Sequence, residues 1–239
     1  QIWKFVYKKG LMQVDSFLNI SNALKENLEN KIDFDRIKIS EEKKSVDGTI
    51  KWLLKLKDNN LVETVYIPFG KTGTLCISSQ VGCTLNCKFC HTGTQMMVRN
   101  LDTSEIVQQL LIAKDRLTDW GSEKKIRNIV YMGMGEPFYN YSNVKKSINI
   151  LNNNFGLDYS PRRITVSTAG VTPQILEAAN EIKTCLALSL HAPNDEIREK
   201  IMPINKKYKI ADLIASCSSY AKINNEKIFL EYVLLKNIN

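Results

Sequence analysis

The chain has 239 residues, with 33 Lys and Arg against 25 Asp and Glu and a formal net charge of +8 at pH 7. This length allows one sizeable domain with a substantial core and a small additional one. No apolar run approaches the roughly 20 residues of a membrane span, and the opening residues lack the apolar centre of a signal peptide, so we expect a cytoplasmic protein without a membrane segment. The basic excess favours an anionic partner such as nucleic acid, although a lysine-rich solvated surface explains the charge equally well.

Residues 1–45 are expected to form a small helical module with a basic surface. Apolar and aromatic residues precede Gly10, which suits a helix end, and Ser21 suits the start of a second helix. Trp3 and Tyr7 lie among lysines and are candidates for contact with RNA. Aromatic residues at helical spacing more often belong to a core, so both interpretations stay open.

Residues 46–72 are expected to form a β-hairpin linker. The segments 49–57 and 61–67 are rich in β-forming residues, and the sequence between them, DNN at 58–60, favours a turn. Glu63 lies within the second strand. From the pattern alone it is an ordinary exposed carboxylate.

Residues 73–239 alternate between strands and helices, which predicts an α/β fold with a parallel sheet, either open or curled into a (β/α) barrel. Asp102 and Glu105 form a capping pattern at the start of the first long helix. The expected strands cover 75–79, 128–132, 164–167, 184–190 and 227–235, and the expected helices begin near 102, 143, 172 and 210.

The segment CTLNCKFCH contains three cysteines, Cys83, Cys87 and Cys90, in the spacing C-x-x-x-C-x-x-C. Three thiolates from one short loop can hold a 4Fe-4S cluster and leave one iron free for a cofactor. Zinc held by the same thiols and His91 is an alternative, but structural zinc ligands usually come as two separated pairs. The last five residues also match the C-x-x-C-H haem attachment pattern, which leaves Cys83 unexplained. Ordinary buried thiols or a disulfide are the remaining alternatives.

Small and polar residues follow the next three expected strands. Because the carboxyl ends of barrel strands meet at one rim, these residues are expected to surround a pocket for a small polar cofactor beside the cysteines. Each cluster also has a simpler explanation, as a turn, a loop cap or a hydrogen bond at a strand end. The clusters are GMGEP at 133–137, STAG at 167–170 and SLHAP at 189–193.

These motifs together resemble the radical S-adenosylmethionine (SAM) superfamily, and within it the ribosomal RNA adenine-C2 methyltransferases that also modify transfer RNA. The resemblance covers nearly the whole chain. The segments that carry it are VETVYIP at 62–68, GTLCISSQVGCTLNCKFC at 73–90, MGMGEP at 132–137, RRITVSTAG at 162–170, LSLHAPND at 188–195 and PINKKY at 203–208.

The resemblance implies a partial radical-SAM (β/α) barrel and a role for each matching residue. Cys83, Cys87 and Cys90 would bind the 4Fe-4S cluster. Glu63 would be a proton acceptor, and Cys76 a second functional cysteine that resolves a covalent RNA intermediate. The positions that match the SAM-binding residues of the family are Gly135, Glu136, Ser167, Ser189, Leu190 and His191.

The implied activity is methylation of carbon 2 of adenine in 23S rRNA and tRNA through a methylcysteine intermediate. One SAM would methylate a cysteine, and reductive cleavage of a second would give the radical that activates this methyl group. The implied partners are the two RNAs and a reducing, flavodoxin-like electron donor. We expect a monomer.

The resemblance also implies that the methyl-carrying cysteine and the sixth barrel strand lie beyond residue 239. Neither Cys185 nor Cys217 suits that role, so residues 1–239 are expected to bind cluster and SAM without completing methyl transfer. Two alternatives remain for the activity. One is methylation at carbon 8 of adenine, as in a sister family, and the other is an Fe-S or zinc protein that binds RNA without catalysis.

Overall fold

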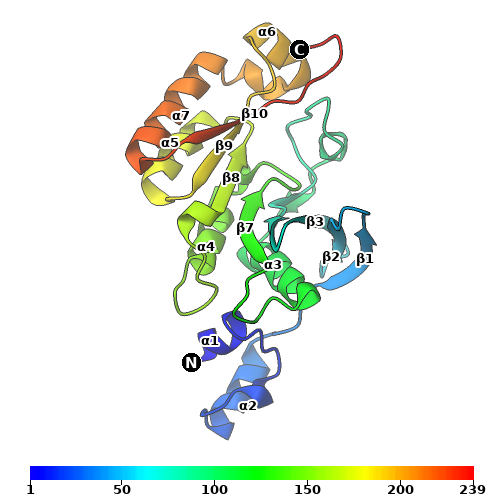
Figure 1. The fold of residues 1–239 in the computed structure, drawn as a ribbon, viewed down its shortest axis with the longest axis vertical. Helices are drawn as coiled ribbons and strands as arrows, with labels where there is room; N and C mark the ends of the chain where they lie inside the picture. Colours follow the sequence, from blue (N-terminus) through cyan, green and yellow to red (C-terminus); the bar gives the residue numbers. More distant parts are fainter.

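An eight-stranded sheet runs through the chain in the order β1-β2-β3-β4-β7-β8-β9-β10. The computed structural model describes all residues 1–239. Its helical module lies at one end of the molecule, and the chain ends at the other, beside α6 (Figure 1). The strands of the large sheet are β1 (Lys38–Lys44), β2 (Ile50–Lys55), β3 (Leu61–Phe69), β4 (Thr72–Cys76), β7 (Ile126–Tyr131), β8 (Ile164–Thr168), β9 (Cys185–Ser189) and β10 (Ile228–Glu231).

The first four strands are antiparallel neighbours. The predicted hairpin is confirmed as β2 and β3, and Asn59 in its turn has a positive φ of 69°. The prediction of helical structure up to residue 45 is wrong for β1, because its seven residues pair with β2. The sequence of β1, KISEEKK, has no apolar alternation, so only the pairing makes it a strand. The domain boundaries near 45 and 72 stay predictions.

The second half of the sheet is parallel, in the order β4-β7-β8-β9-β10, with helices in the connections. This arrangement confirms the predicted α/β fold and partial barrel. The outer strands β1 and β10 each have one neighbour, so the sheet does not close. The helices of this half are α3 (Thr103–Leu117), α4 (Tyr141–Leu151), α5 (Thr172–Glu181), α6 (Asp195–Ile201) and α7 (Ile210–Asn224), of which α6 was not predicted.

Helix α3 begins where the sequence predicts. The Asp102 side chain accepts from the backbone N–H of Glu105, and the Glu105 side chain accepts from that of Asp102 in return. Ile106, Leu110 and Ala113 are fully buried and form the stripe that packs on the sheet. Burying one such leucine or isoleucine side chain contributes about 1.5–3 kcal/mol.

The two faces of the parallel section differ in character. The face under the helices is apolar and buried, as Leu75, Ile129 and Val166 show. The opposite face is mixed and partly open. One row of register partners on this opposite face runs across four strands, from Cys76 through Val130 and Thr165 to Cys185. Polar groups at the strand ends on this face are therefore available to a ligand.

The N-terminal module contains α1 (Ile2–Tyr7) and α2 (Asn22–Lys31) and has a small core of its own around Phe5 and Phe17. Arg36 joins it to α3 through an ion pair with Asp115, with Nε and Oδ2 2.8 Å apart. Tyr7 packs against the main core, which agrees with the interpretation that its ring is a core residue, whereas Trp3 is 37% exposed. RNA binding by this module stays a prediction.

Candidate functional site

The three cysteines lie in a long connection that leaves the end of β4. A short ribbon of β5 (Gln80–Val81) and β6 (Arg99–Asn100) closes the base of this connection. Gly82 has a φ of +77°, and a Cβ there would collide with the Met96 backbone, so the turn requires glycine. The backbone N–H of Lys88 donates to the carbonyl of Ile201 at 2.9 Å, which fixes the loop against the end of α6.

Cys83, Cys87 and Cys90 are free thiols that line one cavity. Burial raises the pKa of Cys87 to about 12, and the thiols of Cys83 and Cys90 add to this effect. Burial also raises the pKa of Cys83. The thiols of Cys83 and Cys87 therefore keep their protons until a cation takes their place. Three unpaired thiols from one loop that line one cavity fit the ligand set of an iron-sulfur cluster with one open iron.

A single metal ion is a poorer fit to this arrangement. No group of three or more His, Cys, Asp and Glu side chains in residues 1–239 lies close enough to hold one ion. A cluster is larger than an ion and holds its thiolates further apart. The zinc alternative therefore gains no support from the geometry.

The cavity has a volume of about 230 Å³ and lies at the carboxyl ends of β7, β8, β9 and β10. The predicted convergence of the strand ends is thus present in the structure. Besides the three cysteines, its lining includes Gly135, Glu136, Ser167, Ser189 and His191.

Glu136 links two strand ends through its carboxylate. Its Oε1 accepts from the backbone N–H of Phe138 at 3.1 Å, and its Oε2 accepts from that of Ala169 at 2.8 Å. Burial raises the pKa of Glu136 to about 7. Each oxygen retains a further lone pair, so a ligand amine or hydroxyl can still bind. Gly135, before it, has a φ of +94° and lies against the Gln80 side chain.

Ser167 and Ser189 meet at a carboxylate that the sequence analysis missed. Both hydroxyls donate to Glu231 Oε2, Ser167 at 3.1 Å and Ser189 at 2.9 Å. The register of β9 and β10 places Glu231 directly beside Ser189. An acidic residue at the carboxyl end of an otherwise apolar strand was the available signal in the sequence.

Leu190 and His191 follow β9 and connect it to the cysteine loop. The backbone N–H of Leu190 donates to the carbonyl of Glu231 at 3.1 Å. The His191 ring meets Phe89 edge to face, with centroids 4.8 Å apart, and its Nδ1 accepts from the N–H of Val233 at 3.1 Å. Burial lowers the pKa of His191, so the ring is neutral at pH 7. Phe89 thus packs at the cavity wall.

Glu63 and Cys76 lie on the open face of the sheet, beside this cavity. Val65, two residues after Glu63, is the register partner of Cys76, so the two side chains point to the same side. Burial raises the pKa of Cys76 to about 11, and the carboxylates of Glu231 and Glu63 add to the effect. Glu63 Oε1 pairs with Lys51 Nζ at 2.8 Å and its side chain is 43% exposed.

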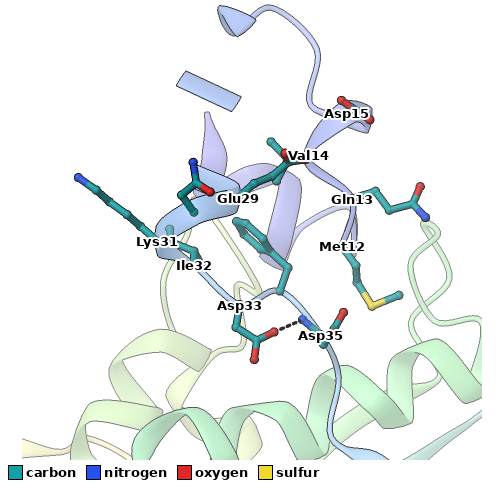
Figure 2. A pocket seen from close by; sticks show the side chains of 11 residues that line it. Met12, Gln13, Val14, Asp15, Glu29, Lys31, Ile32, Asp33 and Asp35 are labelled. Atoms are coloured by element: carbon teal, nitrogen blue, oxygen red, sulfur yellow. Dashed lines mark hydrogen bonds between the residues drawn. The ribbon is translucent and has the colours of Figure 1, made fainter. Parts of the chain in front are cut away.

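The remaining cysteines and pockets lie elsewhere. Cys217 is buried in the main core on α7, and Cys185 is half-buried on β9 outside the cavity lining. A pocket of about 780 Å³ lies in the N-terminal module, between the segments 12–15 and 29–35 (Figure 2). It contains none of the cysteines or strand ends described above, so the candidate chemistry belongs to the smaller cavity. No helix of the structure is both long and apolar enough to span a membrane.

Comparison with protein families matches the part of the chain that holds the parallel strands β7 to β10 and the whole cavity lining. The family described as "Radical SAM superfamily" matches residues 77–239. A crystal structure of a radical SAM methyltransferase from Sphaerobacter thermophilus superimposes with a TM-score of 0.92 at 36% identity, over 100% of this chain and 70% of that one.

Curated relatives are similar over the full length of this chain. The dual-specificity RNA methyltransferase RlmN of Parvibaculum lavamentivorans is 48% identical over 252 residues, which cover 100% of this chain and 63% of the relative. The protein of the same name from Rhodospirillum rubrum is 48% identical over 244 residues, with 57% of its length covered. The chain thus spans less than two thirds of these relatives.

Proposed function

The chain belongs to the radical SAM superfamily, and we propose that it binds a 4Fe-4S cluster and SAM and acts in the methylation of carbon 2 of adenine in 23S rRNA and tRNA. One observation carries this proposal. The three free thiols of the cysteine loop open on the same cavity as the polar ends of the parallel strands. A ligand in this cavity is therefore held between the cysteine loop and the sheet.

The proposed roles follow from position. Cys83, Cys87 and Cys90 hold the cluster, which supplies the electron for reductive cleavage of SAM when bound. Ser167 and Ser189 bind SAM, together with Gly135, Glu136, Leu190 and His191. Because both serine hydroxyls donate to Glu231, their remaining oxygen lone pairs are free to accept from a ligand.

Cys76 and Glu63 are proposed to act on the RNA base rather than on the cofactor. The raised pKa of Cys76 keeps its thiol protonated at neutral pH, so it needs a base before it can act as a nucleophile. Glu63 lies on the same face and is the proposed proton acceptor. Its ion pair with Lys51 must open or shift for this role.

The charge of the open face supports an RNA substrate. Lys43 is the register partner of Lys51, and Lys51 that of Val65 beside Cys76, so basic side chains continue the cavity face onto the antiparallel strands. In the structure these two lysines form ion pairs with Glu41 and Glu63, which an RNA phosphate would have to replace. Phosphate groups of RNA are the complementary ligand. The target base has to leave its stack to reach a cavity at the strand ends.

The proposal is tested by anaerobic reconstitution with iron and sulfide, followed by electron paramagnetic resonance (EPR) of the reduced protein with and without SAM. We expect a 4Fe-4S signal that SAM shifts. Cys83→Ala should lose the cluster, whereas Cys217→Ala, a thiol outside the cavity, should retain it. Absence of a cluster, or bound zinc in its place, contradicts the proposal.

The methylated RNA product distinguishes the proposed activity from the two alternatives. Mass spectrometry of RNA methylated by an enzyme that includes this chain should show 2-methyladenosine. The 8-methyl isomer supports the sister activity instead, and SAM that is never cleaved supports an Fe-S protein without catalysis. A flavodoxin-like electron donor, a cytoplasmic location and a monomeric state belong to the same proposal.

A further inference from the structure

Arg198, on α6, carries a charged side chain with no exposed surface. Its guanidinium donates to four oxygens, all uncharged. Nε donates to the carbonyl of Leu190 at 2.9 Å, and Nη2 to the carbonyls of Ala169 at 2.7 Å and Ser189 at 3.0 Å. Nη1 donates to the side-chain oxygen of Asn205 at 3.0 Å.

This cation has no carboxylate partner, which is unusual for a buried charge. None of the ion pairs in the structure includes Arg198. The other buried cation of the chain, Lys114, shows the ordinary solution, since its Nζ lies 3.0 Å from the buried Asp119 Oδ2. Neutral oxygens satisfy the N–H groups of Arg198 but leave its guanidinium without a carboxylate in contact, which is energetically unfavourable for a buried charge. Asp195 acts on it only from a distance, behind Asn205, whose side-chain N–H donates to Asp195 Oδ1 at 2.8 Å.

The surroundings of Arg198 point to the cysteine loop as the missing partner. Three of its acceptors belong to the strand-end segments after β8 and β9, where Ala169, Ser189 and Leu190 lie at or beside the cavity. The cysteine loop is also fixed to the helix that carries Arg198, because the backbone N–H of Lys88, next to Cys87, donates to the carbonyl of Ile201 at the end of α6, at 2.9 Å.

We propose that Arg198 is the buried counter-charge of the iron-sulfur cluster held by Cys83, Cys87 and Cys90, and that its fork of N–H groups fixes the ends of β8 and β9 against that cluster. The inference rests on the proposed function, since it requires a cluster at these cysteines. Thiolates make such a centre anionic, and the cluster supplies the counter-ion that the protein alone lacks. A fixed positive charge nearby favours addition of an electron and raises the reduction potential.

The test compares reduction potentials of reconstituted protein, measured by EPR-monitored titration. Arg198→Gln removes the charge and retains a hydrogen-bond donor, and Arg198→Lys retains the charge without the planar fork. Lys200→Gln is the matched control. It removes a charge from the same helix, but at an exposed side chain that pairs with Glu196 at 2.7 Å.

We expect Arg198→Gln to make reduction about tenfold less favourable, which is about 59 mV more negative for a one-electron couple. Arg198→Lys should stay within about twofold of the wild type, and Lys200→Gln should leave the potential unchanged. An unchanged potential in Arg198→Gln overturns the inference. So does an equal shift in Lys200→Gln, which would indicate a response to total charge alone.

Two further outcomes are decisive. If Arg198→Gln does not fold, Arg198→Lys decides alone, since a tenfold shift in that variant contradicts a role for the charge and a retained potential supports it. If the wild type forms no cluster, the proposed function fails and this inference fails with it. If the wild type forms a cluster that responds to SAM, but Arg198→Gln has the reduction potential of the wild type, only the inference about Arg198 is rejected and the proposed function stands.

Discussion

Replacement of Glu136 by Gln tests the link between the buried carboxylate and the stability of the cofactor cavity. Glu136 is 2% exposed, and its oxygens accept from the backbone N–H groups of Phe138 and Ala169 and from the side chain of Thr168. With no cation beside it, burial raises its pKa from 4.5 to about 7. The folded protein therefore binds this proton more tightly than the unfolded chain does. The contribution to stability is present in full below pH 4.5 and is lost as the pH rises through 7.

The size of the effect follows from the two pKa values. A pKa difference of 2.5, from 4.5 to about 7, corresponds to about 3 kcal/mol of unfolding free energy at 1.36 kcal/mol for each pKa unit. Roughly 2 kcal/mol of this falls between about pH 5.5 and 8, where the carboxyl loses its proton in the folded state and is already ionised in the unfolded state. His191 acts in the opposite direction, because its pKa is lowered from 6.5 by burial.

The assay is urea unfolding of the metal-free protein at about pH 5.5 and 8, for the wild type and Glu136→Gln. The variant lacks one carboxylate acceptor and is expected to be less stable at the lower pH. The change in its unfolding free energy from about pH 5.5 to 8 should then be roughly 2 kcal/mol more positive than that of the wild type, because the variant lacks the loss from Glu136 and shares the opposite contribution of His191. Equal pH dependence in the two proteins would refute the reasoning, because it would mean that Glu136 ionises in the folded state as it does in water.

Two further pairs of substitutions test the glycine turn at the cavity and the buried ion pair of Lys114 and Asp119, each against an exposed control. Gly135→Ala forces a side chain into a positive φ and against Gln80, so we expect a loss of about 1–3 kcal/mol in urea unfolding and weaker SAM binding. Gly121→Ala, which has open space around it, should change stability by less than about 0.5 kcal/mol, and an equal loss there would contradict the steric argument. Asp119→Asn leaves the buried Lys114 ammonium unpaired and is expected to lower the unfolding free energy by about 3–5 kcal/mol, whereas Glu196→Gln at an exposed pair should leave it nearly unchanged. Similar losses in these two variants would show that burial does not decide the strength of the pairs.

Features that depend on local residue order could be predicted from the sequence. Apolar periodicity and the capping pattern at Asp102 and Glu105 predicted α3. The alternation of strands and helices predicted the parallel section. Since a parallel sheet brings the carboxyl ends of its strands to one edge, the meeting of Ser167 and Ser189 with the cysteine loop also followed from the order of motifs.

Features that depend on partners distant in sequence became visible only in the folded chain. The charged segment of β1 is a strand because β2 offers it backbone hydrogen bonds, and nothing in its own pattern shows this. Glu231 belongs to the cavity because the register of β10 places it beside Ser189. Arg198 resembles any surface arginine of a short charged helix until the fold buries it without a counter-ion. Burial and pairing are properties of the packed chain, and local sequence carries no record of either.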